Sequence, residues 1–184
     1  MLLASEDSVL ALSPRSGRLR WASHVPGRFS ARPAWGEGEI LIVSAEGELS
    51  RLDPATGRLL AREHRTPTQL AVPLGWAGRV TTVSAGGVVE SRGSPSDFWV
   101  LELDEAVASS PIAAGSLFLI GTGKGRLAAL RADRGSTVWN LSARGGFRVA
   151  PLLTPTGLAL ATDQGQVYVY AHLPSAPDPL PEGP

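Results

Sequence analysis

The sequence predicts an all-β fold built from about five repeats of some 40 residues. Prolines mark the period, because successive members of one series are separated by 40, 38 and 40 residues: Pro33, Pro73, Pro111 and Pro151. The segments between them hold apolar or alternating runs of four to six residues, which is the pattern of short strands. No window of 11 residues keeps the apolar period of an amphipathic helix. Strands and turns are therefore expected throughout the repeats.

Two further series of residues keep the same period. Twelve residues before each proline, three of the four positions hold tryptophan: Trp21, Ala61, Trp99 and Trp139. Glycines recur in the polar clusters between the apolar runs, where they supply the positive φ that tight turns require: Gly47, Gly87, Gly125 and Gly165.

A unit of this length with four short strands has the size of one blade of a β-propeller. A single blade cannot bury both of its faces, so consecutive blades are expected to stack around a common axis. We expect the innermost strand of each unit to end at its proline and the outermost strand to hold the tryptophan. Trp21, Trp99 and Trp139 are expected to fill the wedges between blades, which widen away from the axis, whereas Ala61 should leave its wedge thinner.

The strand count predicts five blade units with an incomplete first and last unit. The first unit lacks an innermost strand and the last an outermost strand, so units of three, four, four, four and three strands are expected in residues 1–27, 28–67, 68–105, 106–145 and 146–172. Neither a four-bladed nor a five-bladed ring closes with this number, so we expect open ends that a second copy or another protein completes. The propeller domain is expected to span residues 1–173, and the proline-rich tail, residues 174–184, suits an extended polyproline conformation.

Three segments share a string of residues that ends an apolar run and begins the next strand. Residues 10–21, 49–60 and 127–139 each run from a leucine through a turn to a glycine and an apolar stretch, and two of them end in tryptophan. This string resembles the repeat of quinoprotein-like (PQQ-repeat) β-propellers, and the resemblance covers residues 1 to about 172. The third unit departs from it, because Ser91–Asp97 replaces the turn before the outermost strand. The resemblance implies a typically eight-bladed propeller, related in architecture to WD40-like repeats, and a location that is often periplasmic or extracytoplasmic.

Enzymes of the resembled family hold pyrroloquinoline quinone on the axis with calcium and, in many members, a vicinal disulfide. This chain has no cysteine, its single asparagine is Asn140, and its acidic residues lie mostly in turns, so the oxygen ligands that calcium needs do not converge. We therefore expect no cofactor and no metal site, and we interpret His24 and His64 as surface residues. No catalytic residue is expected either, because no serine or threonine has a base at a motif spacing. The glycines of Gly121–Arg126 match the turn glycines of the other units, not a phosphate loop.

Composition excludes several other classes of protein. The 17 basic and 17 acidic residues balance, which disfavours a nucleic-acid-binding surface. No apolar stretch approaches 18 residues, so no membrane span is expected. The N-terminal stretch is interrupted by acidic residues and shows no signal peptide, which leaves the compartment unknown. The abundance of alanine, glycine, leucine, arginine and proline is typical of bacterial sequences.

Four positions are candidates for contact with a ligand or a partner. Arg32 and Arg148 flank innermost strands of two distant units, and near the axis their guanidinium groups can face an anionic ligand or a partner's carboxylates. Trp35 and Trp76 lie two and three residues after their prolines, in predicted loops where the blade pattern does not require an aromatic side chain. Exposed tryptophan of this kind is a typical anchor of a protein interface.

Together these features favour a non-catalytic propeller scaffold, an interaction module that is not an enzyme. Its rims and open strand edges would bind a protein partner or a second copy of the chain, giving an oligomer. The alternative is a ligand- or cofactor-binding propeller, such as a degenerate quinoprotein dehydrogenase or a sensor domain, that uses the arginines near the axis.

Overall fold

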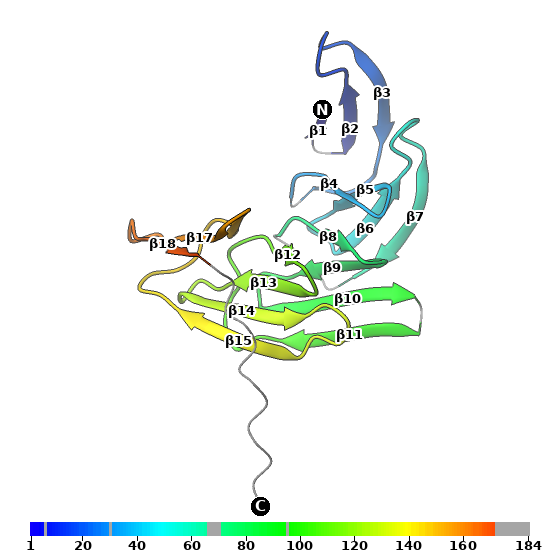
Figure 1. The fold of residues 1–184 in the computed structure, drawn as a ribbon. Coiled ribbons are helices and arrows are strands. Elements are labelled where there is room, and N and C mark those ends of the chain that lie inside the picture. Colours follow the sequence, from blue (N-terminus) through cyan, green and yellow to red (C-terminus); the bar gives the residue numbers. More distant parts are fainter. Residues whose placement is uncertain (6, 30, 66–70, 95, 172–184) are drawn as a thin grey trace, which may run out of the picture.

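A computed structural model describes residues 1–5, 7–29, 31–65, 71–94 and 96–171. These residues form 18 strands and no helix, arranged in five antiparallel sheets that follow one another along an arc (Figure 1). We number the sheets 1 to 5 in chain order, and they hold three, four, four, four and three strands. The predicted fold, with four-stranded antiparallel blades and an incomplete first and last unit, is therefore confirmed.

Within each sheet the strands are hydrogen-bonded in chain order, and the first strands of sheets 2, 3 and 4 pack against one another near the axis. Sheet 1 contains β1 (Leu2–Ser5), β2 (Ser8–Leu12) and β3 (Leu19–His24); sheet 2 contains β4 (Ala34–Gly36), β5 (Glu39–Val43), β6 (Glu48–Leu52) and β7 (Leu59–His64). Sheet 3 contains β8 (Leu74–Trp76), β9 (Arg79–Val83), β10 (Val88–Ser94) and β11 (Asp97–Glu102); sheet 4 contains β12 (Ile112–Ala114), β13 (Leu117–Gly121), β14 (Arg126–Arg131) and β15 (Thr137–Ser142). Sheet 5 contains β16 (Leu152–Thr154), β17 (Gly157–Ala161) and β18 (Val167–Tyr170).

The repeated prolines lie on the other side of the innermost strands from the predicted one. Each of these strands begins directly after its proline instead of ending at it, as β4 does at Ala34 and β8 at Leu74. Proline has no N–H to donate to the second strand, so the ladder starts one residue later. As a consequence Trp35 and Trp76 lie within β4 and β8, and the prediction that they lie in loops is wrong.

The core of the molecule lies between the sheets. Four clusters of buried apolar side chains fill the four interfaces between consecutive sheets. Strands in the middle of the arc are buried on both faces, so β13 is a continuous apolar run with Phe118 fully buried. Because each sheet packs only against its neighbours, the fold is a stack and has no single central core.

Two tryptophans of the outermost strands join their sheet to the next one. The indole Nε1 of Trp21 donates to the carbonyl oxygen of Pro54 at 3.0 Å, and that of Trp99 donates to Ala132 at the same distance. Each acceptor lies 33 residues further along the chain, in the turn before the outermost strand of the following sheet. The ring of Trp21 lies over Gly57, where an added Cβ would come within 2.4 Å of it. This close approach explains why tryptophan and glycine recur together in the repeat.

Charged side chains hold the interface between sheets 2 and 3. Its tryptophan position is Ala61, and its apolar cluster is the smallest of the four. The side chain of Arg65 is fully buried and donates to the carboxylates of Glu63 and Glu90, each at 2.8 Å. Arg51, which pairs with Ala61 across the two outer strands, also donates to Glu63, at 3.1 Å. Guanidinium and carboxylate groups therefore occupy the wedge that the small side chain of Ala61 leaves.

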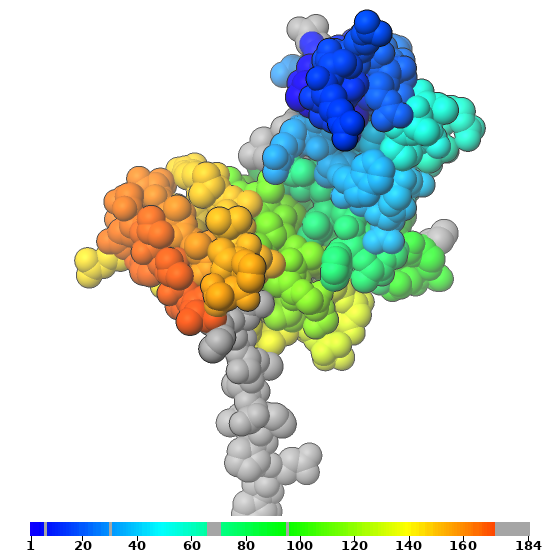
Figure 2. Space-filling view, turned by 45° about the horizontal axis from the view of Figure 1, so that its top comes forward, coloured from blue at the N-terminus to red at the C-terminus, as the bar shows by residue number. Residues whose placement is uncertain are grey.

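The two end sheets expose faces that the inner sheets bury. Val167 and Val169 of β18 are 71% and 75% exposed, whereas Leu127 and Ala129, one repeat earlier, are fully buried against sheet 5. Sheets 1 and 5 stand apart at the two ends of the arc in both views (Figure 2), so the described residues do not close into a ring. The predicted domain boundary at residue 173 lies outside the described residues. No helix in the part of the chain that the structure describes has the length and apolar character to cross a membrane.

Candidate functional site

One rim of the arc carries two clefts, each beside one of the predicted tryptophans. The rim is formed by the turns between the first and second strands and by the turns between the third and outermost strands. One cleft lies between sheets 3 and 4 and the other between sheets 1 and 2. We call them the Trp76 cleft and the Trp35 cleft.

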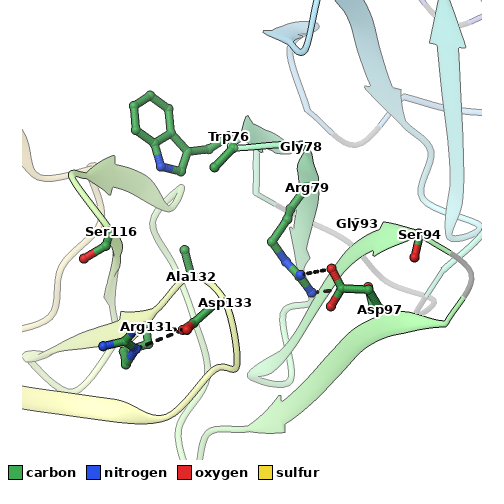
Figure 3. Close-up of a pocket in the computed structure, with 11 residues that line it drawn as sticks. Trp76, Gly78, Arg79, Gly93, Ser94, Asp97, Ser116, Arg131, Ala132 and Asp133 are labelled. Atoms are coloured by element: carbon green, nitrogen blue, oxygen red, sulfur yellow. Dashed lines mark hydrogen bonds and ion pairs between the residues drawn. The ribbon is translucent and has the colours of Figure 1, made fainter.

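The Trp76 cleft is a cavity of about 360 Å³ that opens beside the innermost strand of sheet 3. Figure 3 shows Trp76 above the cleft, with Arg79 and Asp97 on the wall from sheet 3 and Arg131 and Asp133 on the wall from sheet 4. Trp76 is 42% exposed, although it belongs to a strand. The cleft lining includes Ala132, whose carbonyl oxygen accepts from Trp99, so a residue of the contact between the two sheets also forms part of the cleft wall.

Ion pairs occupy both walls of the Trp76 cleft. The buried guanidinium of Arg79 donates to the carboxylate of Asp97 at 2.5 Å and to the hydroxyl of Ser91 at 3.1 Å. On the other wall, Arg131 donates to both carboxylate oxygens of Asp133, at 2.9 Å each. Because these charged groups are already paired, the feature left to contact a ligand is the apolar indole above them.

The Arg131 guanidinium lowers the pKa of the Asp133 carboxyl to about 2, chiefly through the hydrogen bonds between the two side chains. A carboxyl whose folded-state pKa is lowered stabilises the fold above its unfolded pKa, and this contribution is lost as the pH falls towards 2. We expect Asp133 to titrate near pH 2 in a carbon-detected NMR titration, and Arg131→Gln to move its pKa back towards 3.8. An unchanged pKa in the variant would show that the pair does not form in solution.

The Trp35 cleft, at the first interface of the arc, also combines an exposed tryptophan with a turn that contacts the neighbouring sheet. Its cavity of about 520 Å³ brings together Trp35 and Arg32 from sheet 2 with Leu2 and Leu12 from sheet 1. Pro54, whose carbonyl oxygen accepts from Trp21, lines it as Ala132 lines the other cleft. Trp35 is 64% exposed. Two interfaces therefore combine an exposed indole with a turn whose carbonyl oxygen accepts from a second, less exposed indole.

Near the axis, the innermost strands of sheets 2 and 3 touch through glycine. A Cβ on Gly36 would lie 2.5 Å from the Cα of Gly75 in the facing strand. Any side chain at either position would push the two backbones apart, so the close approach requires glycine in both strands.

The structure separates the two predicted arginines. Arg148 lines a small cavity of about 110 Å³ between the inner connections of sheets 3 to 5, and Arg32 lines the Trp35 cleft instead. The carboxylate of Asp163 accepts from Arg148 at 3.2 Å, which neutralises this guanidinium. Of the four predicted contact residues, Arg32 and Trp35 share one cavity, whereas Trp76 and Arg148 line two others.

Sequence analysis missed the ion pairs on the walls of the Trp76 cleft. Arg131 and Asp133 lie in one of the quoted strings and carry no separate signal. Arg79 and Asp97 come from the irregular third unit, whose departure from the repeat at Ser91–Asp97 does not by itself predict an ion pair. In the structure β10 continues to Ser94, and this longer hairpin places Asp97 beside Arg79.

Two histidines each lie close to one acidic side chain. His24 lies 3.4 Å from Asp7, and His64 lies 3.2 Å from Glu48, at corresponding places in sheets 1 and 2. Within residues 1–171, leaving aside the positions that the structure does not describe, no three histidine or acidic side chains gather in a way that could hold a metal ion.

Four-stranded antiparallel sheets in an arc, joined at two of their interfaces by a tryptophan on a glycine turn, define a quinoprotein-like (PQQ-repeat) β-propeller. The sequence model of one family matches residues 5–172, and that family is described as outer membrane protein assembly factor BamB. This chain belongs to it, and the predicted family resemblance is confirmed.

Individual relatives are distant. The outer membrane protein assembly factor BamB of Nitrosomonas eutropha is 27% identical over 110 residues, which make up 59% of this chain and 27% of that protein. The crystal structure of BamB from Moraxella catarrhalis matches with a TM-score of 0.74 and 19% identity, over 93% of this chain and 57% of that one. The computationally designed Ika4 protein matches with a TM-score of 0.68 and 15% identity, over 79% of this chain and 92% of that one. The solved structures show the shared fold, and the chain spans about a quarter of the curated relative.

Proposed function

We propose that this chain is a non-catalytic propeller module that binds a protein partner through the rim that carries the Trp35 and Trp76 clefts. The observation that carries the proposal is the exposure of two indoles on innermost strands, each above a cleft of several hundred Å³. Tryptophan at such a position buries a large apolar area when a partner covers it, and it is among the residues that dominate binding energies.

The paired charges of the Trp76 cleft favour a protein over a small charged ligand at this cleft. Arg79 and Arg131 are each held by a carboxylate, so an anion entering the Trp76 cleft would have to displace an existing ion pair. A partner's apolar side chain can instead contact Trp76 while the surrounding ion pairs stay intact at the edge of the interface.

The family supports the same class of function. Its description and that of the relative from Nitrosomonas eutropha name an outer membrane protein assembly factor, which is a role in bringing other proteins together. For this chain, which spans part of its relatives, the role as a scaffold is carried over as part of the proposal, and the rim defines where the partner would bind.

The test compares the wild-type chain with Trp35→Ala/Trp76→Ala and with the matched control Val100→Ala, which removes an exposed side chain from the outermost strand of sheet 3. Proteins retained from an extract of the source organism are identified by mass spectrometry, purified and titrated by calorimetry. We expect each tryptophan replacement to weaken binding at least tenfold and the control to change it less than twofold, because truncation of a central tryptophan costs about 2 kcal/mol or more.

Two results would contradict the proposal. The first is a purified partner that binds the double variant as tightly as the wild type. The second is uptake of pyrroloquinoline quinone in a one-to-one ratio, seen by absorbance, with no protein retained, which would support the cofactor-binding alternative.

A further inference from the structure

The indole of Trp139 lacks the partner that its counterparts have. Trp139 pairs with Ala129 across the two outer strands of sheet 4, as Trp21 pairs with Ala11 in sheet 1. It is 9% exposed, and its Nε1 finds no acceptor in the described part of the chain. Trp21 and Trp99 show where the acceptor belongs, on the turn that precedes the outermost strand of the following sheet.

That turn and that strand are absent from sheet 5 as described. The order of its strands is β16-β17-β18, so β18 forms the outer edge, where β15 covers β14 in sheet 4. The N–H of Thr162 donates to the carbonyl oxygen of Gln166 at the end of the hairpin. Along an antiparallel pair, the N–H and C=O groups of successive residues point alternately towards the partner strand and away from it. The backbone groups of Val167 and Val169 therefore point away from β17, towards the open side. The edge thus offers two donors and two acceptors beside an unpaired indole N–H.

The proline-rich tail does not suit this edge in the register of the repeat. In sheet 4 the N–H of Ala143 donates to the carbonyl oxygen of Gly125, and by the same alternation Trp139 and Leu141 present their N–H groups to β14. Forty residues later these two positions are Pro179 and Pro181, which have no N–H. A slip of one residue would restore donors but would reverse the faces of all side chains.

We propose that the outer edge of β18, together with the indole of Trp139, is an acceptor site for an extended segment of a partner polypeptide. The segment has N–H groups at both positions that face Val167 and Val169. Before it comes a turn with a carbonyl oxygen for Trp139 and a glycine under the ring, because a Cβ at the corresponding Gly135 would come within 2.5 Å of Trp99. Strand addition of this kind gains its affinity from main-chain hydrogen bonds.

The site is separate from the rim that carries the proposed function. It lies on sheet 5 and on the outermost strand of sheet 4, and none of its residues lines the Trp35 cleft or the Trp76 cleft. A negative result in the test of one site therefore does not bear on the proposal for the other site.

The test uses the full chain labelled with ¹⁵N and a synthetic peptide with the sequence of residues 131–142, which contains a turn and an outermost strand of the required type. We expect the indole resonance of Trp139 to shift on titration and the amides of Val167 and Val169 to exchange with solvent at least tenfold more slowly. The control peptide carries W139P and L141P and should bind at least tenfold more weakly, since it loses two hydrogen bonds worth about 1 kcal/mol each. In the protein, Trp139→Phe keeps the ring but removes the donor, and it should weaken binding threefold to tenfold.

Three outcomes would overturn the inference. One is an unmoved Trp139 indole with unprotected Val167 and Val169 amides at millimolar peptide. Another is protection of those amides in the free chain at every dilution, which would show that the tail covers the edge. Protection that depends on the chain's own concentration would assign the edge to a second copy.

Discussion

Replacing Trp21 by alanine should lower the free energy of unfolding by about 3–5 kcal/mol, the usual cost of removing a buried aromatic side chain. Trp21 is 9% exposed and fills the wedge between sheets 1 and 2, where its ring covers Gly57 and its Nε1 donates to Pro54. The variant loses the apolar contact, leaves a cavity and orphans the carbonyl oxygen of Pro54. Urea unfolding followed by circular dichroism measures the change.

Two further variants separate the causes of this loss. Trp21→Phe keeps an aromatic ring against Gly57 and removes the hydrogen bond, so it should cost about 1–2 kcal/mol. Leu19→Ala truncates an exposed side chain of the same strand and should change stability by less than about 0.5 kcal/mol. If Trp21→Ala were as mild as Leu19→Ala, the indole would not be the element that joins the two sheets.

Replacing Glu90 by glutamine should cost about 3 kcal/mol, because it leaves the fully buried guanidinium of Arg65 with one carboxylate in place of two. Glu90 also accepts from Arg92 at 3.1 Å, so the substitution removes the carboxylate partner of a second guanidinium group at the interface between sheets 2 and 3. Thermal and urea unfolding should both register the loss.

A double-mutant cycle shows whether the two charges act as a pair. Arg65→Met combined with Glu90→Gln should cost less than the sum of the single changes, with a coupling of about 1–3 kcal/mol. As a surface control, Glu102→Gln removes an exposed carboxylate from the outermost strand of sheet 3 and should leave the unfolding free energy nearly unchanged at neutral pH. Additive effects of the two interface substitutions would mean that Glu90 does not neutralise Arg65.

The architecture was predictable because it depends on spacing. Prolines, turn glycines and tryptophans at a period of about 40 residues determine the order, the number and the incompleteness of the sheets, and the structure confirms all three. The position of the prolines was predicted on the wrong side of the strand, because a period locates a residue within a repeat but does not say which strand end it marks. That depends on the missing N–H of proline, which decides where the ladder can begin.

The charged interface was not predicted, although the repeat contains a signal for it. Arg65 stands where the neighbouring units have the buried residues Val25 and Leu103, and in each case the backbone N–H donates to the turn between the second and third strands. Glu90 corresponds to the buried Ala128 of the next sheet. A basic and an acidic residue at two apolar positions of adjacent repeats indicate a buried pair, but only the facing of the strands shows that they meet.

The candidate clefts could be predicted only in part. Composition and spacing single out Trp35 and Trp76 as aromatics that the repeat does not require, but they do not reveal that one faces sheet 1 and the other sheet 4. This follows from the pairing of Trp35 with Ile40 and of Trp76 with Arg79, which assigns each indole to one side of its sheet.

In this stacked arrangement, the cooperativity of unfolding depends on the interfaces between consecutive sheets. Sheets 1 and 5 are coupled only through the three sheets between them. The free energy of partial unfolding is therefore set by the weakest interface. The junction of sheets 2 and 3 depends on buried ion pairs, where loss of one partner leaves the other charge unpaired away from water, while the other junctions depend mainly on apolar contact. Substitution of one of these charges therefore weakens one junction of the arc, and the two-sheet and three-sheet portions on either side of it are the natural units of local unfolding.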